Sequence, residues 1–264
     1  MVQQVFKMKI IVTWLLFAGV IAVNALANIL PINGYNTGQI SAFYPNAFVP
    51  AGFTFSIWGV IYLLLLSYTI GYTYYTLKRQ QYPKAYLFIE RINFYFLLTC
   101  LFNMAWIVAW HYLQIELSVV IMLLFLSTLI QLFLKTKSMA YDLTTTQKFI
   151  LQTPFIVYLG WISVATIANI TALLVAYKWT ALSIAPVYWS AAMILIAIVL
   201  ALLMVKKFQV VSFTLVVAWA LWGIYNAQGP AAPILARLTA IGIGVLISAV
   251  LFRFIQQFRE SRVA

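Results

Sequence analysis

Charged residues are scarce in this sequence. They make up 8% of the 264 residues, whereas 65% are hydrophobic; ordinary globular chains have about 25% charged and roughly 45 to 50% apolar residues. Sixteen basic and four acidic side chains are too few to cover the surface of a soluble protein of this length. The composition excludes soluble enzymes, secreted scaffolds and fibrous proteins, and it predicts a protein that lies mostly in a lipid bilayer.

Residues that carry redox, metal or acid–base chemistry are also few. With Cys100 as the single cysteine, neither an intrachain disulfide nor a cysteine-based metal cluster can form. His111 is the single histidine; we expect an interfacial side chain there, with an axial ligand to a tetrapyrrole as the alternative. No carboxylate is expected at mid-membrane, because all four acids fall in predicted loops or at predicted helix ends: Glu90, Glu116, Asp142 and Glu260. These absences predict a protein that is not an enzyme and has no metal site.

Eight apolar segments are long enough to cross a bilayer, since about 20 residues span the hydrocarbon core as a helix. None of them alternates apolar and polar residues as barrel strands do. We therefore expect an all-α, polytopic membrane helix bundle with eight transmembrane helices. The expected helices are Ile10–Leu30, Thr54–Leu77, Asn93–Tyr112, Leu117–Leu134, Phe149–Tyr177, Ile184–Val205, Val210–Ala227 and Ala232–Phe254.

Lysine and arginine gather in alternate loops between these segments. Fourteen basic residues lie on one predicted side, and two, Lys178 and Arg237, lie on the other. Because cytoplasmic loops hold the excess, we predict a multi-pass protein of the plasma membrane with cytoplasmic N- and C-termini. The same distribution explains the net charge of +12, so the lipid bilayer, and not nucleic acid, is the expected partner. One alternative stays open: Lys7 and Lys9 precede an apolar run that ends in Ala25-Leu26-Ala27, as in a cleaved signal peptide.

The connection between the first two predicted helices, Pro31–Phe53, is long and uncharged. It lies on the predicted outer side and contains proline and aromatic residues. A connection of this length exceeds what neighbouring helices need, so we expect it to fold as a lid, with a plain connector as the alternative. The expected lid residues are Phe43, Tyr44, Pro45 and Pro50.

Three predicted helices carry aromatic or amide side chains at positions i, i+3 and i+7, which lie on one helix face. In the second and third helices we expect these faces to line a pocket for a flat ligand. In the seventh helix, packing and an interfacial aromatic belt are the preferred interpretation. The sets are Phe55, Trp58 and Tyr62; Asn103, Trp106 and Trp110; and Trp219, Trp222 and Asn226.

Small residues recur at four-residue spacing in the last predicted helix. Because small side chains let helix backbones approach closely, we expect this face to pack against another helix. The residues are Ala232, Ala236, Ala240, Gly244 and Ser248.

Three motifs occur in order within residues 40–177. They are Pro50, Phe53, Phe55, Trp58 and Tyr62; Asn103-Met104-Ala105-Trp106; and Tyr158-Leu159-Gly160-Trp161 followed by Asn169. These motifs resemble the tryptophan-rich sensory protein, or translocator protein, family (TspO/MBR). The resemblance implies a five-helix bundle that binds porphyrins, haem-like molecules or sterols and is often a homodimer. Accordingly, residues 1–180 are expected to form a TspO-like ligand-binding bundle of five helices, and residues 181–264 three additional transmembrane helices.

With this resemblance, the aromatic faces predict an integral membrane receptor or sensor for a small, flat hydrophobic ligand, namely a tetrapyrrole such as porphyrin or haem, or a sterol-like molecule. No cofactor is required, and a porphyrin or haem would be bound as the ligand. A facilitator or exporter of small hydrophobic or amphipathic solutes is the alternative, and an enzyme that degrades porphyrin is a third reading. Trp161 and Asn169 are about 80° apart around a helix, so both can face one cavity. The expected ligand-binding residues are Phe55, Trp58, Tyr62, Asn103, Trp106, Trp110, Trp161, Ala165 and Asn169.

Overall fold

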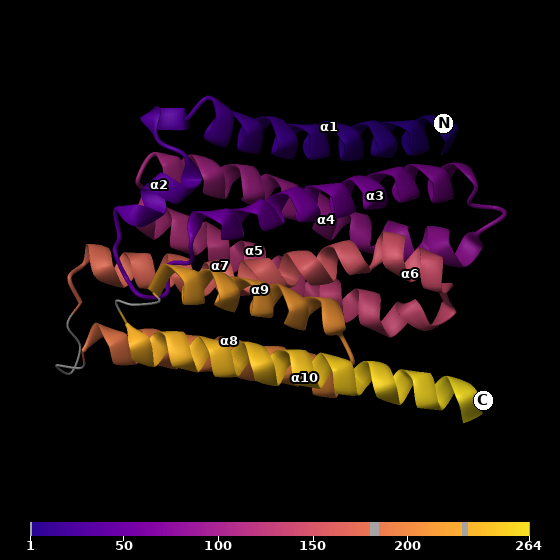
Figure 1. Ribbon diagram of the computed structural model, residues 1–264. Helices are drawn as coiled ribbons and strands as arrows, with labels where there is room; N and C mark the ends of the chain where they lie inside the picture. Colours follow the sequence, from indigo (N-terminus) through magenta and orange to yellow (C-terminus); the bar gives the residue numbers. More distant parts are fainter. Residues whose placement is uncertain (1, 180–184, 229–231, 264) are drawn as a thin grey trace. The chain divides into compact units, whose positions relative to one another are not determined.

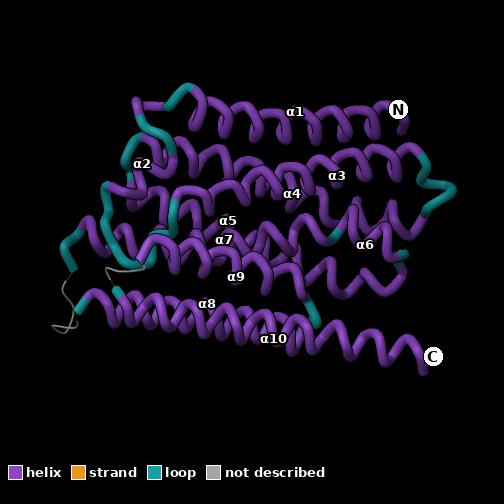
Figure 2. Tube along the Cα trace, in the orientation of Figure 1, coloured by secondary structure: helices purple, strands orange, loops and turns teal. Residues whose placement is uncertain are grey.

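The computed structural model describes residues 2–179, 185–228 and 232–263, and every regular element within these ranges is a helix (Figures 1 and 2). The predicted all-α, polytopic helix bundle is confirmed. The long helices are α1 Val2–Ile29, α3 Ile57–Leu77, α4 Pro83–His111, α5 Ile115–Met139, α7 Thr153–Ala176, α8 Pro186–Phe208, α9 Val211–Gln228 and α10 Pro233–Val263.

The eight expected segments all correspond to helices, but a count of eight membrane crossings is not confirmed. Seven helices in the described ranges are long and apolar enough to cross a membrane, and α9 is not among them. It has 18 residues, which span about 27 Å at the α-helical rise, less than a hydrocarbon core of about 30 Å. Asn226 and Gln228 also lower the hydropathy of its last turn.

Several helices extend beyond the apolar runs that predicted them. Helix α4 begins at Pro83 and not near Asn93, so Glu90 lies two turns inside the helix. There it forms an ion pair with Lys9 of α1. The expectation that all four acids lie in loops or at helix ends is therefore wrong for Glu90. Hydropathy ends a predicted span at the first charges, whereas long charged side chains can reach the interface from inside a helix.

The expected helix Phe149–Tyr177 is two helices. Helix α6 spans Thr145–Leu151 and opens with a capping box, in which Thr144 and Gln147 each accept a hydrogen bond from the backbone of the other. Helix α7 starts at Thr153, and its second residue is Pro154. The break follows from this proline, which lacks the N–H that would continue the preceding helix and is tolerated in a first turn.

The helices group into two compact units. The first unit comprises Met1–Ile40 and Ile57–Leu159, and the second comprises Ser41–Ser56 and Gly160–Ala264. The predicted domain boundary at residues 180–181 lies outside the described residues, and the division into residues 1–180 and 181–264 stays a prediction. Each unit is described separately below.

Two chains of side-chain hydrogen bonds cross the interior of the first unit. In one, Asn24 of α1 donates to Asn103 of α4, which donates to the hydroxyl of Tyr158 on α7. In the other, the Tyr68 hydroxyl of α3 donates to Asn93 of α4, which donates to Thr13 of α1, and Thr13 donates to the carbonyl of Lys9. Buried polar groups need such partners in a medium without water. The two chains therefore tie α1, α3, α4 and α7 together.

In the second unit, α10 packs against α8 and α9 through a face centred on Gly242. A Cβ atom added there would lie 2.5 Å from Ile198 Cδ1 and 3.3 Å from Leu221 Cδ1. The expected close-packing face with Gly244 is wrong for this chain, because Gly244 is exposed and an added Cβ atom would meet nothing within 4 Å. The packed face comprises Leu235, Thr239, Gly242, Leu246 and Val250, all buried.

This packing predicts that leucine substitutions at two nearby glycines have different effects on stability. We expect Gly242→Leu to destabilise the fold by about 1 to 3 kcal/mol, since it overpacks a filled helix contact. Gly244→Leu, on the exposed face, should leave stability nearly unchanged. Melting temperatures of both variants in the same detergent provide the measurement, and equal melting behaviour would contradict the assigned face.

Candidate functional site

At the end of α4, His111 holds the beginning of the connection between α1 and α3. The side chain is fully buried, with Nδ1 3.2 Å from the Ile32 carbonyl oxygen and Nε2 3.1 Å from Thr37 Oγ1. The carbonyl can only accept, so Nδ1 carries the proton, and in the neutral ring Nε2 accepts from the threonine hydroxyl. Asn33 donates to the His111 carbonyl at 3.0 Å. His111 is therefore packed inside the first unit with both ring nitrogens occupied, and its position at the membrane interface stays a prediction.

Trp106 and Trp110 form a stacked pair beside this histidine. Their ring centroids are 5.8 Å apart with an interplanar angle of 18°, as four-residue spacing on one helix face allows. Each is 6% exposed. The Trp110 indole N–H donates to the Thr37 carbonyl at 3.3 Å. These two predicted ligand-binding residues therefore lie together, with their ring faces turned to each other and the Trp110 N–H edge turned to the connection that His111 holds.

A second aromatic cluster of the first unit contains Trp58 and Tyr62 of α3. These rings stack, with centroids 5.6 Å apart and an interplanar angle of 20°. The ring of Tyr158 meets Trp58 edge to face at 6.0 Å, and its hydroxyl is fixed by Asn103 at 2.8 Å. Asn103 is in turn held by Asn24 at 2.6 Å. Trp58 and Tyr62 are partly exposed, so this cluster presents some ring surface on a hydrogen-bonded backing.

The remaining predicted ligand-binding residues lie in the second unit. Phe55 meets Trp161 edge to face, with centroids 6.0 Å apart. Trp161 is 3% exposed and Asn169, two turns further along α7, is 2% exposed. Ala165, between them, is partly exposed. Helix α7 thus carries the predicted indole and amide in buried positions.

The end of the uncharged connection packs on α9 in the second unit. The Ala51 N–H donates to the Gly223 carbonyl at 3.0 Å, and the Trp219 indole donates to the Thr54 carbonyl at 3.0 Å. Phe53 meets the Trp219 ring edge to face at 5.5 Å. A Cβ atom at Gly223 would lie 2.0 Å from Thr54 Oγ1. Only glycine therefore leaves room for this close approach.

The residues expected to form a lid differ in exposure. Phe43 and Pro45 are exposed, whereas Tyr44 and Pro50 are partly buried. Asn46 closes a turn here, since it accepts from the Phe48 N–H at 2.9 Å and donates to the Tyr44 carbonyl at 2.8 Å. The connection contains two short helical segments, Ile32–Gly34 and Thr37–Ala42, and a third, Gly52–Ser56, follows Ala51.

Sequence reasoning missed two parts of this arrangement. The aromatic face of α9 was expected to serve packing or an aromatic belt, and Trp219 does pack, but its partner, the connection that also bonds Gly223, was not predicted. The four-residue spacing of these two residues was a usable signal. The chain of Tyr68, Asn93 and Thr13 was also missed. The sequence indicated these hydrogen bonds only through polar residues that lie inside the apolar runs of three helices.

A family model described as TSPO-like protein matches residues 10–252. Since this match covers most of the chain, the chain belongs to the TSPO-like protein family. The match runs through α8 and α9 and into α10, further than the motifs of residues 40–177 indicated. Nothing matches the chain among curated proteins or among solved structures. The fold and the family together define a multi-pass membrane protein of the TspO type.

The contact between the connection and α9 generates a prediction. Gly223→Ala should displace Pro50 and Thr54, because the added methyl group overlaps both residues. Hydrogen exchange at residues 51–54 should accelerate at least about tenfold, since the Ala51 hydrogen bond is lost with the contact. Gly59→Ala is the matched control, because an added Cβ atom meets nothing within 4 Å there. Unchanged exchange in Gly223→Ala would show that the contact does not hold the connection.

Proposed function

We propose that this protein is a membrane receptor or sensor that binds a flat hydrophobic ligand, either a tetrapyrrole such as porphyrin or haem, or a sterol-like molecule. Its membership of the TSPO-like family supports a ligand-binding membrane protein. The stacked, partly exposed pair of Trp58 and Tyr62 is the observation that carries the proposal. A flat ring system gains both apolar contact and stacking on such a surface.

The backing of this pair supports binding and not catalysis. Tyr158 and the amides of Asn103 and Asn24 form a chain of hydrogen bonds at distances of 2.8 and 2.6 Å. Such groups position rings and donate or accept hydrogen bonds, but they do not exchange protons near neutral pH. The proposed protein is therefore not an enzyme and requires no cofactor, and a bound porphyrin is its ligand.

Titration with protoporphyrin, followed by Soret absorbance, tests the proposal. Trp58→Leu should weaken binding about tenfold or more, since stacking on an aromatic side chain contributes about 1 to 3 kcal/mol per ring. Tyr62→Phe keeps the ring and should keep the affinity. Trp179→Leu is the control, because Trp179 is 47% exposed and contacts Trp189 in the second unit.

Two results would contradict this proposal. Folded Trp58→Leu protein with unchanged porphyrin affinity would remove the ring pair from the site. Saturable porphyrin flux in liposomes that contain the protein would instead identify a facilitator or exporter. Melting curves of each variant, recorded first, separate loss of affinity from loss of fold.

We propose that the protein lies in the plasma membrane with both termini in the cytoplasm. Contacts in the first unit support it, because they bring basic helix ends together. Arg79, after α3, lies over the Phe6 ring of α1 at 4.3 Å. Lys84 of α4 pairs with Asp142, after α5, at 2.8 Å. A single charged end of the unit is what the positive-inside rule requires.

Cysteine labelling checks this orientation. In a Cys100→Ser background, a cysteine at the exposed position Pro45 should react with an impermeant maleimide added outside intact cells. A cysteine at the exposed position Gln80 should react only after the membrane is permeabilised. The opposite pattern would reverse the topology.

A further inference from the structure

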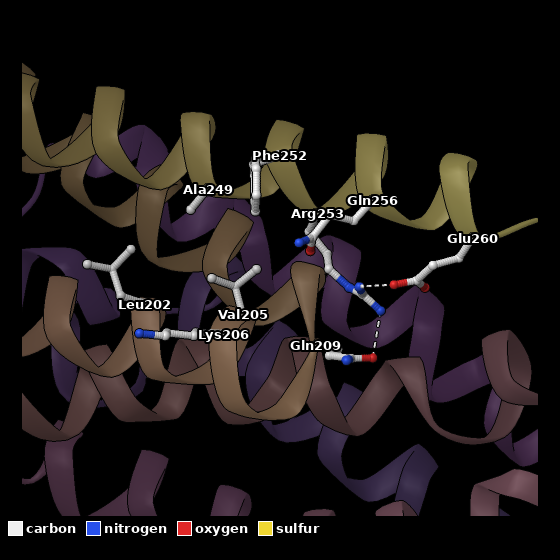
Figure 3. A pocket seen from close by; sticks show the side chains of 9 residues that line it. All are labelled: Leu202, Val205, Lys206, Gln209, Ala249, Phe252, Arg253, Gln256 and Glu260. Atoms are coloured by element: carbon white, nitrogen blue, oxygen red, sulfur yellow. Dashed lines mark hydrogen bonds and ion pairs between the residues drawn. The ribbon is translucent and has the colours of Figure 1, made fainter.

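The second unit contains a cavity between α8 and α10 that is separate from the aromatic clusters. It has a volume of about 610 Å³ and lies where both helices change from apolar to charged residues (Figure 3). Its apolar walls are Leu202, Val205, Ala249 and Phe252, and its polar walls are Lys206, Gln209, Arg253, Gln256 and Glu260. The walls therefore fit a molecule with an apolar part and a polar head.

Arg253 is the central charge of this cavity. The residue is only 9% exposed. Its Nη2 donates to Gln209 Oε1 at 2.6 Å, its Nη1 lies 3.6 Å from Glu260 Oε1, and its buried Nε has no hydrogen-bond partner in the described chain (Figure 3). A buried guanidinium needs an acceptor for each donor. The Nε–H donor is thus left without an acceptor in the wall of the cavity.

The Glu260 carboxylate does not neutralise the site. It is 68% exposed and 3.6 Å away, so solvent weakens its interaction with Arg253. Lys206 adds a second positive charge to the walls. The lining side chains therefore carry two positive charges and one exposed negative charge, which favours an anion.

Gln209 orients the Arg253 side chain in the cavity wall. It ends α8 with φ 59° and ψ 33°, the left-handed conformation that favours glycine. A glycine would have no side chain to accept from Arg253. Glutamine at this position instead orients the guanidinium, because its amide oxygen accepts from Nη2.

From these contacts we infer that the cavity binds the phosphate of an anionic amphiphile, the headgroup of an anionic membrane lipid. In this proposal the Arg253 guanidinium donates to the phosphate oxygens, Lys206 adds positive charge to the walls, and the acyl chain lies along Leu202 and Phe252. Arginine and lysine are the side chains that proteins use for phosphate. This site is independent of the proposed receptor site, which uses aromatic rings and amides.

The full-length protein in a neutral detergent can be titrated with short-chain phosphatidylglycerol, and with phosphatidylcholine of the same chain length. Phosphatidylglycerol should bind at least about tenfold more tightly. Lys206→Gln should weaken its binding about fivefold, as expected for about 1 kcal/mol per basic residue at an anionic lipid surface. Lys207→Gln is the matched control, because this exposed neighbour carries the same charge but does not line the cavity.

Two further variants test the individual groups. Glu260→Gln removes the competing carboxylate and should strengthen binding. Arg253→Lys keeps the charge but loses the Nε donor and the planar fork, so it should weaken binding. If Arg253→Lys does not fold, as judged by its melting curve, the comparison of Lys206 with Lys207 decides the question.

Competition with inorganic phosphate distinguishes a site for a lipid headgroup from a site for soluble phosphate. If millimolar phosphate displaces phosphatidylglycerol from the wild-type protein but not from Lys206→Gln, the site takes soluble phosphate as well, which supports the assigned anion chemistry. If phosphate has no effect while the lipid discriminates among the variants, the ligand is the headgroup. Equal binding of the two lipids, or equal effects of Lys206→Gln and Lys207→Gln, would overturn the proposal.

Discussion

Inside a bilayer, every buried polar group must find its partner within the protein, and the arrangement of this chain depends on that requirement. In the first unit the amides of Asn24, Asn93 and Asn103 satisfy it through partners on other helices. Each such bond contributes only about 0.6 kcal/mol on average in a membrane protein. The larger effect of these bonds is on how the helices are positioned along one another. A helix that shifts by one turn along its axis would separate each amide from both its hydrogen-bond donor and its acceptor. The aromatic rings on these helices are consequently held in fixed positions.

The uncharged connection between α1 and α3 meets the same requirement with different groups. Its backbone has no strand or long helix to supply hydrogen bonds, so side chains and helix ends must do so. Within the first unit His111 and Trp110 bind the carbonyls of Ile32 and Thr37. Within the second unit Trp219 and Gly223 bind Thr54 and Ala51. The polar atoms of indole and imidazole rings are thus used to anchor backbone, whereas the stacked rings of Trp58 and Tyr62 stay partly exposed.

Hydropathy was sufficient to locate the helices, because apolar runs in a chain with so little charge have no other means of burial. It was not sufficient for their ends, since Lys9 and Glu90 pair inside α1 and α4, nor for the break before Pro154. The packed face of α10 was missed for a geometric reason. Five residues at strict four-residue spacing sweep about 160° around a helix of 3.6 residues per turn, so they cannot form one face. The candidate site was predictable in its residue types and helix faces, whereas the pairing of Trp106 with Trp110 depends on tertiary contacts with Thr37 and its neighbours.

The same geometry accounts for Arg253. It lies 18 residues after Leu235, which is about five full helical turns, so it falls on the buried face of α10 and not on the exposed one. The basic residues at helix ends generally act as interfacial anchors and topology signals. Arg253 is an exception, because packing forces a charge into the interface between α8 and α10 that burial alone would disfavour. Gln209, which ends α8 in a left-handed backbone conformation, accepts from one of its donors. Helix packing alone does not account for a buried arginine whose Nε donor has no acceptor and whose partner Gln209 is in a left-handed conformation. An anionic ligand accounts for this arrangement.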